Sequence, residues 1–187
     1  MPPPAIGPLL GSGKIAEIFA YGDAALKLYR SPGGRADAFR EAAILALVGT
    51  HGLPVPEVQS AGRFGDRWGL VMSRAPGTPL AALAEADPAL VPAVLDEMVR
   101  LHLTLHRCSD TRLRPLRARL AANIGTAPQL DARLREQLLA RLAALPDGDR
   151  LCHGDFHPYN LIGAPGATMI VDWPDATCGP PAADVCR

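Results

Sequence analysis

The chain contains 187 residues, of which 48% are hydrophobic, and its 19 basic residues balance 19 acidic residues. This length and composition allow one ordinary folded domain or two small lobes with a real apolar core. Because the formal net charge is zero, no overall field attracts the chain to nucleic acid or to an anionic membrane, so we expect a small-molecule partner.

The first part of the chain predicts short strands followed by one helix. Within residues 8–30, apolar residues alternate on both sides of a turn at Gly22 and Asp23, which is typical of two or three short strands. Residues 35–50 have a strong helical pattern, and Glu41 is the one acidic residue on their apolar face. The pattern therefore predicts a small β-rich lobe with a single helix.

A β-hairpin is predicted to complete this lobe. Residues 55–64 and 67–75 each have a strand pattern, and a Gly-Asp turn separates them. The segment APGTPL that follows breaks regular structure, so we expect a lobe boundary near residue 76.

The second part of the chain predicts a mostly helical lobe. Asp87 and Pro88 supply an N-cap and a first helical residue, and two further helices fit residues 115–124 and 129–144. The helix that Asp87 caps carries apolar residues at helical spacing: Val91, Val94, Leu95, Met98, Leu101 and Leu105.

Short strands are expected around Leu151, at residues 160–163 and at residues 168–173. The whole pattern predicts an α+β fold with two lobes, residues 1–75 and residues 76–187. A cleft between two lobes is a common place for a ligand to bind.

Membrane insertion and disulfide bonding are not expected. No stretch approaches the roughly 18 consecutive apolar residues of a membrane span, and the N-terminus lacks the pattern of a secretory leader. The cysteines show no C-x-x-C spacing, which favours free thiols in a reducing compartment. We therefore expect a cytoplasmic protein with four free cysteines: Cys108, Cys152, Cys178 and Cys186.

The segment HGDFHPYN, residues 153–160, places several polar side chains between two apolar dipeptides. Unpaired buried polar groups cost roughly 1–3 kcal/mol each, so these side chains are either paired or used. Protein kinases have the catalytic pattern H-R-D-x-x-x-x-N, and His153, Asp155 and Asn160 match every position except the Arg. Phosphoryl transfer needs a carboxylate to orient a hydroxyl group and accept its proton, and oxygen ligands to hold Mg²⁺.

Other elements of the kinase pattern occur in the expected order. A glycine-containing turn partly matches the kinase glycine-rich loop, a strand then ends in Lys, the next helix carries an acid, and a late strand ends in Asp. Each match is weak alone, but their order together with the catalytic pattern is specific. The residues are Gly11, Ser12, Gly13, Lys27, Glu41 and Asp172.

On these motifs the chain resembles the aminoglycoside phosphotransferases and the related choline and homoserine kinases, from about Ile6 to Arg187. The resemblance implies a protein-kinase-like fold and the use of ATP and Mg²⁺ to phosphorylate a hydroxyl of a small, cationic molecule. It implies that Asp155 is the catalytic base and that His157 lies near the γ-phosphate. It also implies that Asp184 braces the catalytic loop.

The resemblance assigns the remaining residues to nucleotide and metal. It implies that a glycine loop covers the phosphates, that a Lys held by a Glu contacts the α- and β-phosphates, and that hinge backbone groups pair with adenine. These residues are, for the nucleotide, Gly11, Ser12, Gly13, Lys27, Glu41, Ser73 and Ala75, and, for Mg²⁺, Asn160 and Asp172.

The chain departs from the family pattern at its end. Relatives continue into helices that shape the acceptor pocket, whereas this chain ends at Arg187, so we expect an incomplete C-terminal lobe whose exposed apolar surface supports self-association. The short helix that Pro180 and Pro181 open is expected to fray and to loosen Asp184. The motifs do not distinguish among acceptors or between ATP and GTP, and a nucleotide-binding module without turnover is the alternative function.

Three further patterns suggest other chemistry more weakly. The segment GSGK does not complete a Walker A loop, because Pro8 and Ile15 stand where that loop needs Gly and Ser or Thr. His102 and His106 have the spacing of helical zinc ligands without the metalloprotease Glu, so we expect structural roles for them. A run of arginines favours a solvated surface over an anion contact: Arg107, Arg112, Arg114, Arg117 and Arg119.

Overall fold

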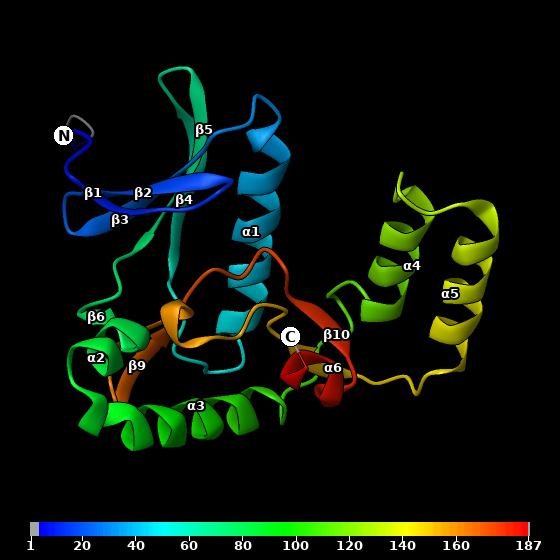
Figure 1. Ribbon diagram of the computed structural model, residues 1–187. Coiled ribbons are helices and arrows are strands. Elements are labelled where there is room, and N and C mark those ends of the chain that lie inside the picture. The colour runs from blue at the N-terminus through cyan, green and yellow to red at the C-terminus, as the bar shows by residue number, and fades with distance from the viewer. Residues whose placement is uncertain (1–3, 187) are drawn as a thin grey trace. The chain divides into compact units, whose positions relative to one another are not determined.

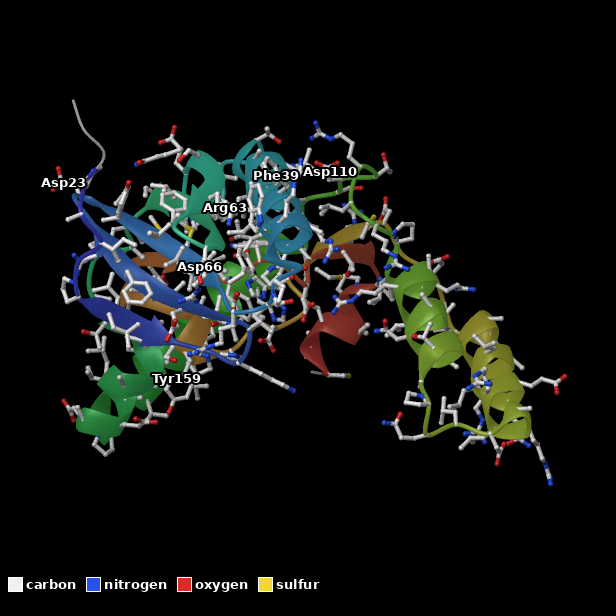
Figure 2. The ribbon with its side chains drawn as sticks, turned by 90° about the horizontal axis from the view of Figure 1, so that it is seen from above. Asp23, Phe39, Arg63, Asp66, Asp110 and Tyr159 are labelled. Atoms are coloured by element: carbon white, nitrogen blue, oxygen red, sulfur yellow. The ribbon has the colours of Figure 1, made fainter. Side chains whose placement is uncertain are left out.

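A computed structural model describes residues 4–186 of the chain and gives its first part a five-stranded antiparallel sheet, in the order β1-β2-β3-β5-β4 (Figure 1). Gly22 and Gly65 have φ values of 59° and 63°, which suit the tight turns between β2 and β3 and between β4 and β5. Figure 2 labels Asp23 and Asp66, which follow these glycines. The bounds are β1 Leu9–Ser12, β2 Ala16–Tyr21, β3 Ala24–Tyr29, β4 Val58–Phe64 and β5 Arg67–Ser73.

Helix α1, Gly34–Gly49, packs against β3, β4 and β5. Its buried face contains Ile44, Leu45 and Val48, and Glu41 lies on the same face, which confirms the prediction for this helix. Leu26 and Leu28 of β3 pack in a separate apolar cluster with Val71 and partly buried aromatic rings. The strand β3 is thus buried along its length and holds its central residue, Lys27, in a fixed place.

Several short elements follow the sheet. Asp87 accepts a hydrogen bond from the backbone N–H of Ala89 at 3.0 Å, which confirms it as a cap, although a 3₁₀ turn separates it from the main helix. A small sheet has the order β6-β8-β9. The bounds are β6 Thr78–Pro79, α2 Leu80–Ala86, η1 Pro88–Leu90, α3 Val91–Leu105, η2 Pro158–Asn160, β8 Leu161–Ala164 and β9 Ala167–Ile170.

The remaining elements are two helices that pack side by side and a two-stranded sheet (Figure 1). Their positions confirm the predicted helices near residues 115–124 and 129–144 and the predicted strand around Leu151. The bounds are α4 Leu116–Thr126, α5 Ala132–Ala144, β7 Arg150–Cys152, β10 Thr177–Gly179 and α6 Pro181–Val185.

Contacts between residues divide the chain into two compact units. The first comprises the described residues up to Met98 together with His157–Pro174, and the second comprises Val99–Phe156 and the described residues from Asp175 onward. The boundary near residue 76, which was inferred from sequence for the two lobes, stays a prediction.

For α3 and α6, two expectations from the sequence were wrong. Leu95 and Val91, which share the helical spacing of their apolar neighbours on α3, are 54% and 39% exposed, whereas Val94 and Leu101 are buried. Asp184 does not lie on a frayed segment, since it is buried in α6 and accepts hydrogen bonds from backbone and side chains. The last residue, Arg187, lies outside the described residues.

No helix among the described residues combines the length and the apolar character that a membrane crossing requires. The four cysteines are free thiols, as predicted, and Cys152 is a buried residue at the end of β7.

Candidate functional site

A buried ion pair joins the sheet to α1 in the first unit. Lys27, in the middle of β3, and Glu41, on the inner face of α1, are both almost completely buried. The Lys27 ammonium nitrogen lies 2.7 Å from Glu41 Oε2 and donates a hydrogen bond to Oε1 at 2.8 Å. The hydroxyl of Tyr29 donates to the same carboxylate. Glu41 therefore holds two donors that point from alternate residues of one strand.

Asp172 binds the same ammonium group. Its Oδ1 lies 2.7 Å from Lys27 Nζ, and its side chain is 45% exposed while that of Lys27 is buried. The formal charges of Lys27, Glu41 and Asp172 sum to −1. Of the two carboxylates, only that of Asp172 is accessible to solvent. A half-exposed carboxylate beside a buried cation is a suitable ligand for an additional cation.

The backbone at Asp172 is unusual. Its φ of 66° is the one positive value among the non-glycine residues that the structure describes, and such values are uncommon outside Gly, Asn and Asp. Buried Trp173 follows it and donates from Nε1 to the carbonyl of Ile170 at 2.9 Å. The indole thus fixes the backbone on both sides of Asp172 and holds its carboxylate against Lys27.

The charges around Lys27 determine its protonation. Burial alone lowers the pKa of Lys27, but the adjacent carboxylates of Glu41 and Asp172 outweigh that effect and raise it above its ordinary value. Burial is also the main cause that raises the pKa of Tyr29, and Glu41 adds to it. Lys27 therefore stays charged and Tyr29 stays a neutral donor across the physiological range.

Asn160 lies at the same end of a hairpin as Asp172. The pairing of β8 with β9 places Leu161 opposite Ile170, and the backbone N–H of Val171 donates to the Asn160 carbonyl at 2.9 Å. The Asn160 side-chain amide contacts His157 Nε2 at 3.2 Å. The first unit therefore brings Asn160, Asp172 and His157 into one region, next to Lys27.

The glycine-containing turn between β1 and β2 is braced by one arginine. Arg30 donates to Ser12 Oγ at 2.8 Å and to the Gly13 carbonyl at 3.2 Å. A Cβ atom added at Gly11 would meet nothing within 4 Å, and one added at Gly13 would make only ordinary contact. The fold itself leaves room for a side chain at both positions, and the contact of this turn with a nucleotide stays a prediction.

The predicted hinge begins where β5 ends. Ser73 pairs with Ala24 across the sheet, its N–H donates to the Glu57 carbonyl at 2.8 Å, and its Oγ accepts from the Glu57 N–H at 2.8 Å. Ala75 follows in an irregular segment before β6. Ser73 is thus held firmly at the end of β5, and the contact of either residue with adenine stays a prediction.

In the second unit, Asp184 holds the turn that leads to Asp155. The backbone N–H groups of His153 and Gly154 donate to Asp184 Oδ2 at 3.0 Å and to Oδ1 at 2.7 Å. The Asp155 N–H donates to His153 Nδ1 at 3.2 Å. This arrangement agrees with the brace that the resemblance implied for Asp184. It fixes the backbone immediately before the predicted base.

Asp184 also accepts from two imidazoles. Burial by itself would raise the pKa of Asp184, but hydrogen bonds from His102, His106 and the backbone of Gly154 and His153 hold it well below the ordinary value for Asp. The side chain is therefore a buried carboxylate with four donors.

Sequence reasoning missed several of the residues that hold these turns. Arg119, which was expected on a solvated surface, binds Asp175, and Arg117 donates to the carbonyls of Ala143 and Leu145. Tyr29 gave no signal as a partner of Glu41 beyond its place two residues after Lys27. These contacts join residues far apart in the chain, so no local spacing could indicate them.

The structure thus collects Lys27, Glu41, Asp172, Asn160 and His157 in the first unit. Asp155 belongs to the second unit, and its role as base stays a prediction.

Comparison with known families decides the kind of protein. Residues 14–187 match the model of the phosphotransferase enzyme family. The chain belongs to this family. No curated protein matches it in sequence.

Solved structures of aminoglycoside phosphotransferases share the fold of this chain. A thermostable mutant of aminoglycoside phosphotransferase APH(4)-Ia has a TM-score of 0.69 at 21% identity, over 97% of this chain and 71% of that one. An aminoglycoside-3'-phosphotransferase of type VIII has a TM-score of 0.64 at 22% identity, over 99% of this chain and 76% of that one. The likeness confirms the predicted α+β, protein-kinase-like fold.

Proposed function

We propose that this phosphotransferase uses ATP and Mg²⁺ to phosphorylate a hydroxyl group of a small cationic molecule, such as an aminoglycoside or an amino alcohol. The observation that carries the proposal is the buried Lys27–Glu41 pair with the half-exposed Asp172 carboxylate on the same ammonium group. Phosphoryl transfer needs a cation fixed beside the phosphates and an acid that can hold Mg²⁺, and this cluster supplies both.

The nucleotide would bind in the first unit. Lys27 keeps its charge through Glu41 and can turn from Asp172 to the α- and β-phosphates when the nucleotide enters. Gly11, Ser12 and Gly13 offer backbone groups, with open space above Gly11. The Ser73 carbonyl and the Ala75 N–H would pair with adenine.

Asn160 and Asp172 would hold Mg²⁺ through oxygen atoms, because hard cations prefer carboxylate and carbonyl ligands. When bound, the ion neutralises charge on the phosphate oxygens. Each of these two residues lies just beyond the paired part of the β8–β9 hairpin, which keeps them at one end of it.

Asp155 would orient the acceptor hydroxyl and accept its proton. The hydroxyl oxygen then forms a bond to the γ-phosphorus, the bond from that phosphorus to the bridging oxygen breaks, and ADP leaves with the electron pair. His157 would lie near the γ-phosphate. The brace from Asp184 supports this role because it fixes the backbone of His153 and Gly154.

Similar structures in complex with a nucleotide and an aminoglycoside support this proposal. APH(4)-Ia variants occur in ternary complexes with AMP-PNP or ADP and hygromycin B, and APH(2")-IIa occurs in a ternary complex with streptomycin and ATP. The chain shares 16–21% identity with these proteins, so the acceptor of this enzyme has to be found by experiment.

The test is an ATP-consumption assay with Mg²⁺ and a panel of aminoglycosides, amino alcohols and sugars, with the product identified by mass. We expect one class of acceptor to gain a phosphoryl group, and we expect Asp155→Asn to abolish that gain while nucleotide affinity stays nearly unchanged. Nucleotide binding without transfer to any acceptor would favour the alternative of a binding module. Full turnover by Asp155→Asn would remove Asp155 from the mechanism.

A further inference from the structure

Two imidazoles and one carboxylate meet in the second unit. His102 lies in the last turn of α3, and His106 follows directly after the helix, with its N–H donating to the His102 carbonyl at 3.0 Å. The ring centroids are 4.2 Å apart. The Nε2 atom of each ring lies 3.1 Å from the same atom, Asp184 Oδ2. The three atoms that could bind an ion all lie within 4.8 Å of one another. The proposed phosphoryl transfer assigns no role to either histidine.

We propose that His102, His106 and Asp184 bind a divalent transition-metal ion of the Zn²⁺ type. Two imidazole nitrogens and one carboxylate oxygen are ligands that Zn²⁺ and its neighbours in the series prefer, and two histidines at positions i and i+4 of a helix are a common source of such ligands. The sequence showed the histidine spacing, and the fold adds the third ligand.

The distances suit this ion. Metal–ligand bonds of about 2.0–2.1 Å at tetrahedral angles place neighbouring ligand atoms roughly 3.3 Å apart. The two nitrogen–oxygen distances of 3.1 Å differ from that value by only a few tenths of an ångström. Small rotations of the side chains would therefore admit the ion between them, with each neutral ring carrying its single proton on Nδ1 so that the Nε2 lone pair can bind the ion.

The ligands are held in place by a second layer of contacts. The Gly154 N–H donates to Asp184 Oδ1 and the His153 N–H donates to Oδ2, so backbone groups fix both carboxylate oxygens while Oδ2 also faces the histidines. The His102 ring stacks on Phe156, with centroids 4.3 Å apart and planes 8° apart. Fixed ring and carboxylate orientations are typical of metal ligands and favour binding, because these side chains lose less conformational entropy when the ion binds.

The site is also accessible. The side chains of His102 and His106 are 16% and 11% exposed, while that of Asp184 is buried. An ion can thus enter from the histidine side, and the three protein ligands leave a fourth position for water or another ligand. Because Asp184 also binds the turn at residues 153–154, the ion would tie α3 to that turn.

The experiment uses the full chain after treatment with a chelator. Zn²⁺ binding is measured by calorimetry in the presence of millimolar Mg²⁺, which occupies oxygen-rich sites, and Co²⁺ serves as a spectroscopic probe. We expect one Zn²⁺ per chain, a higher melting temperature with Zn²⁺, and a visible Co²⁺ spectrum of a four-coordinate site without a thiolate charge-transfer band. The absence of that band excludes the four cysteines as ligands.

The variants His102→Gln and His106→Gln retain an N–H that can donate to Asp184 but remove an imidazole ligand. Each variant should lower the affinity for Zn²⁺ at least tenfold and remove the Zn²⁺-dependent rise in melting temperature. The control is His51→Gln, at a histidine of the first unit, which should bind Zn²⁺ as the parent protein does. Binding that is equal in all three variants, or no binding of either ion by the parent, would overturn the proposal. Two glutamine positions are used so that one misfolded variant leaves the test intact.

Discussion

The guanidinium group of Arg119, on α4, binds both the side chain and the main-chain carbonyl of Asp175. Arg119 Nη2 lies 2.5 Å from Asp175 Oδ1, and Nη1 donates to the Asp175 carbonyl. That carbonyl lies close to Gly154 and leaves no room for a side chain there, since a Cβ atom at Gly154 would lie 2.4 Å from its oxygen. One arginine on a neighbouring helix therefore acts on the turn that precedes Asp155.

Replacing this arginine should affect both stability and turnover. We expect Arg119→Ala to lower the free energy of unfolding by about 1–3 kcal/mol, because two charge-assisted hydrogen bonds are lost, and to lower kcat with little change in nucleotide affinity. Urea unfolding and steady-state kinetics with both substrates check this. Exposed Arg133 on α5 provides the control, and an Arg119→Ala protein that behaves like Arg133→Ala would contradict the expectation.

A comparison of Gly154 with Gly166 separates the cost of a steric clash from the cost of an unfavourable backbone conformation. It has a φ of 81°, and Gly166 has a φ of 87° with nothing within 4 Å of an added Cβ atom. Gly166→Ala should cost about 1–3 kcal/mol of unfolding free energy, from conformation alone. Gly154→Ala should cost roughly 1–3 kcal/mol more, from the clash with Asp175. Equal losses in denaturant titrations of the two variants would show that the carbonyl moves aside freely.

The buried ion pair should behave as a coupled unit. Lys27→Met leaves Glu41 buried without its cation, and we expect a loss of about 3–5 kcal/mol in unfolding free energy. The double variant Lys27→Met with Glu41→Gln removes both charges and keeps an acceptor for Tyr29, so it should recover much of that loss. Both variants should lose nucleotide affinity, because neither has the ammonium group. A double variant that is as unstable as the sum of the single ones would show that the pair has no coupling.

Cys152 should be inert to alkylation. Burial, with a smaller effect of Asp184, raises the pKa of this thiol to about 12. A thiol whose pKa is higher in the folded state than in the unfolded state stabilises the fold fully below the unfolded value of 9.0, and that contribution declines as pH rises from there towards 12.

The measurement for Cys152 is a comparison of alkylation rates in the native protein at pH 8. Cys186 is exposed and should react first, and Cys152 should react only upon unfolding. A Cys152→Ala variant should lose less stability than the parent protein between pH 8 and pH 10. Rapid labelling of Cys152 under native conditions would show that the end of β7 opens.

Much of this fold follows from short-range patterns. The order of strand, helix and hairpin placed Lys27 and Glu41 correctly on facing elements, because alternation within β3 and periodicity within α1 each fix which side chain points inward. The burial of Glu41, which looks costly in the sequence, is explained by its two donors.

Other contacts depend on tertiary structure and could not be predicted. The Arg119–Asp175 pair joins residues 56 positions apart, and a run of arginines looks the same whether it faces water or a carboxylate. Leu95 has the spacing of a core residue, yet helical spacing alone does not define how wide the buried stripe is. The roles of individual residues in catalysis remain predictions that the variants above address.

The surplus negative charge of the Lys27, Glu41 and Asp172 cluster has a thermodynamic consequence for the proposed function. A nucleotide that arrives without a divalent ion brings like charge to Asp172, and an ion that arrives first finds a carboxylate already shared with Lys27. Each ligand therefore lowers the cost of binding the other, so nucleotide and Mg²⁺ should bind with positive cooperativity. The coupling is reciprocal, and whatever factor the ion contributes to nucleotide affinity, the nucleotide contributes to the affinity for the ion.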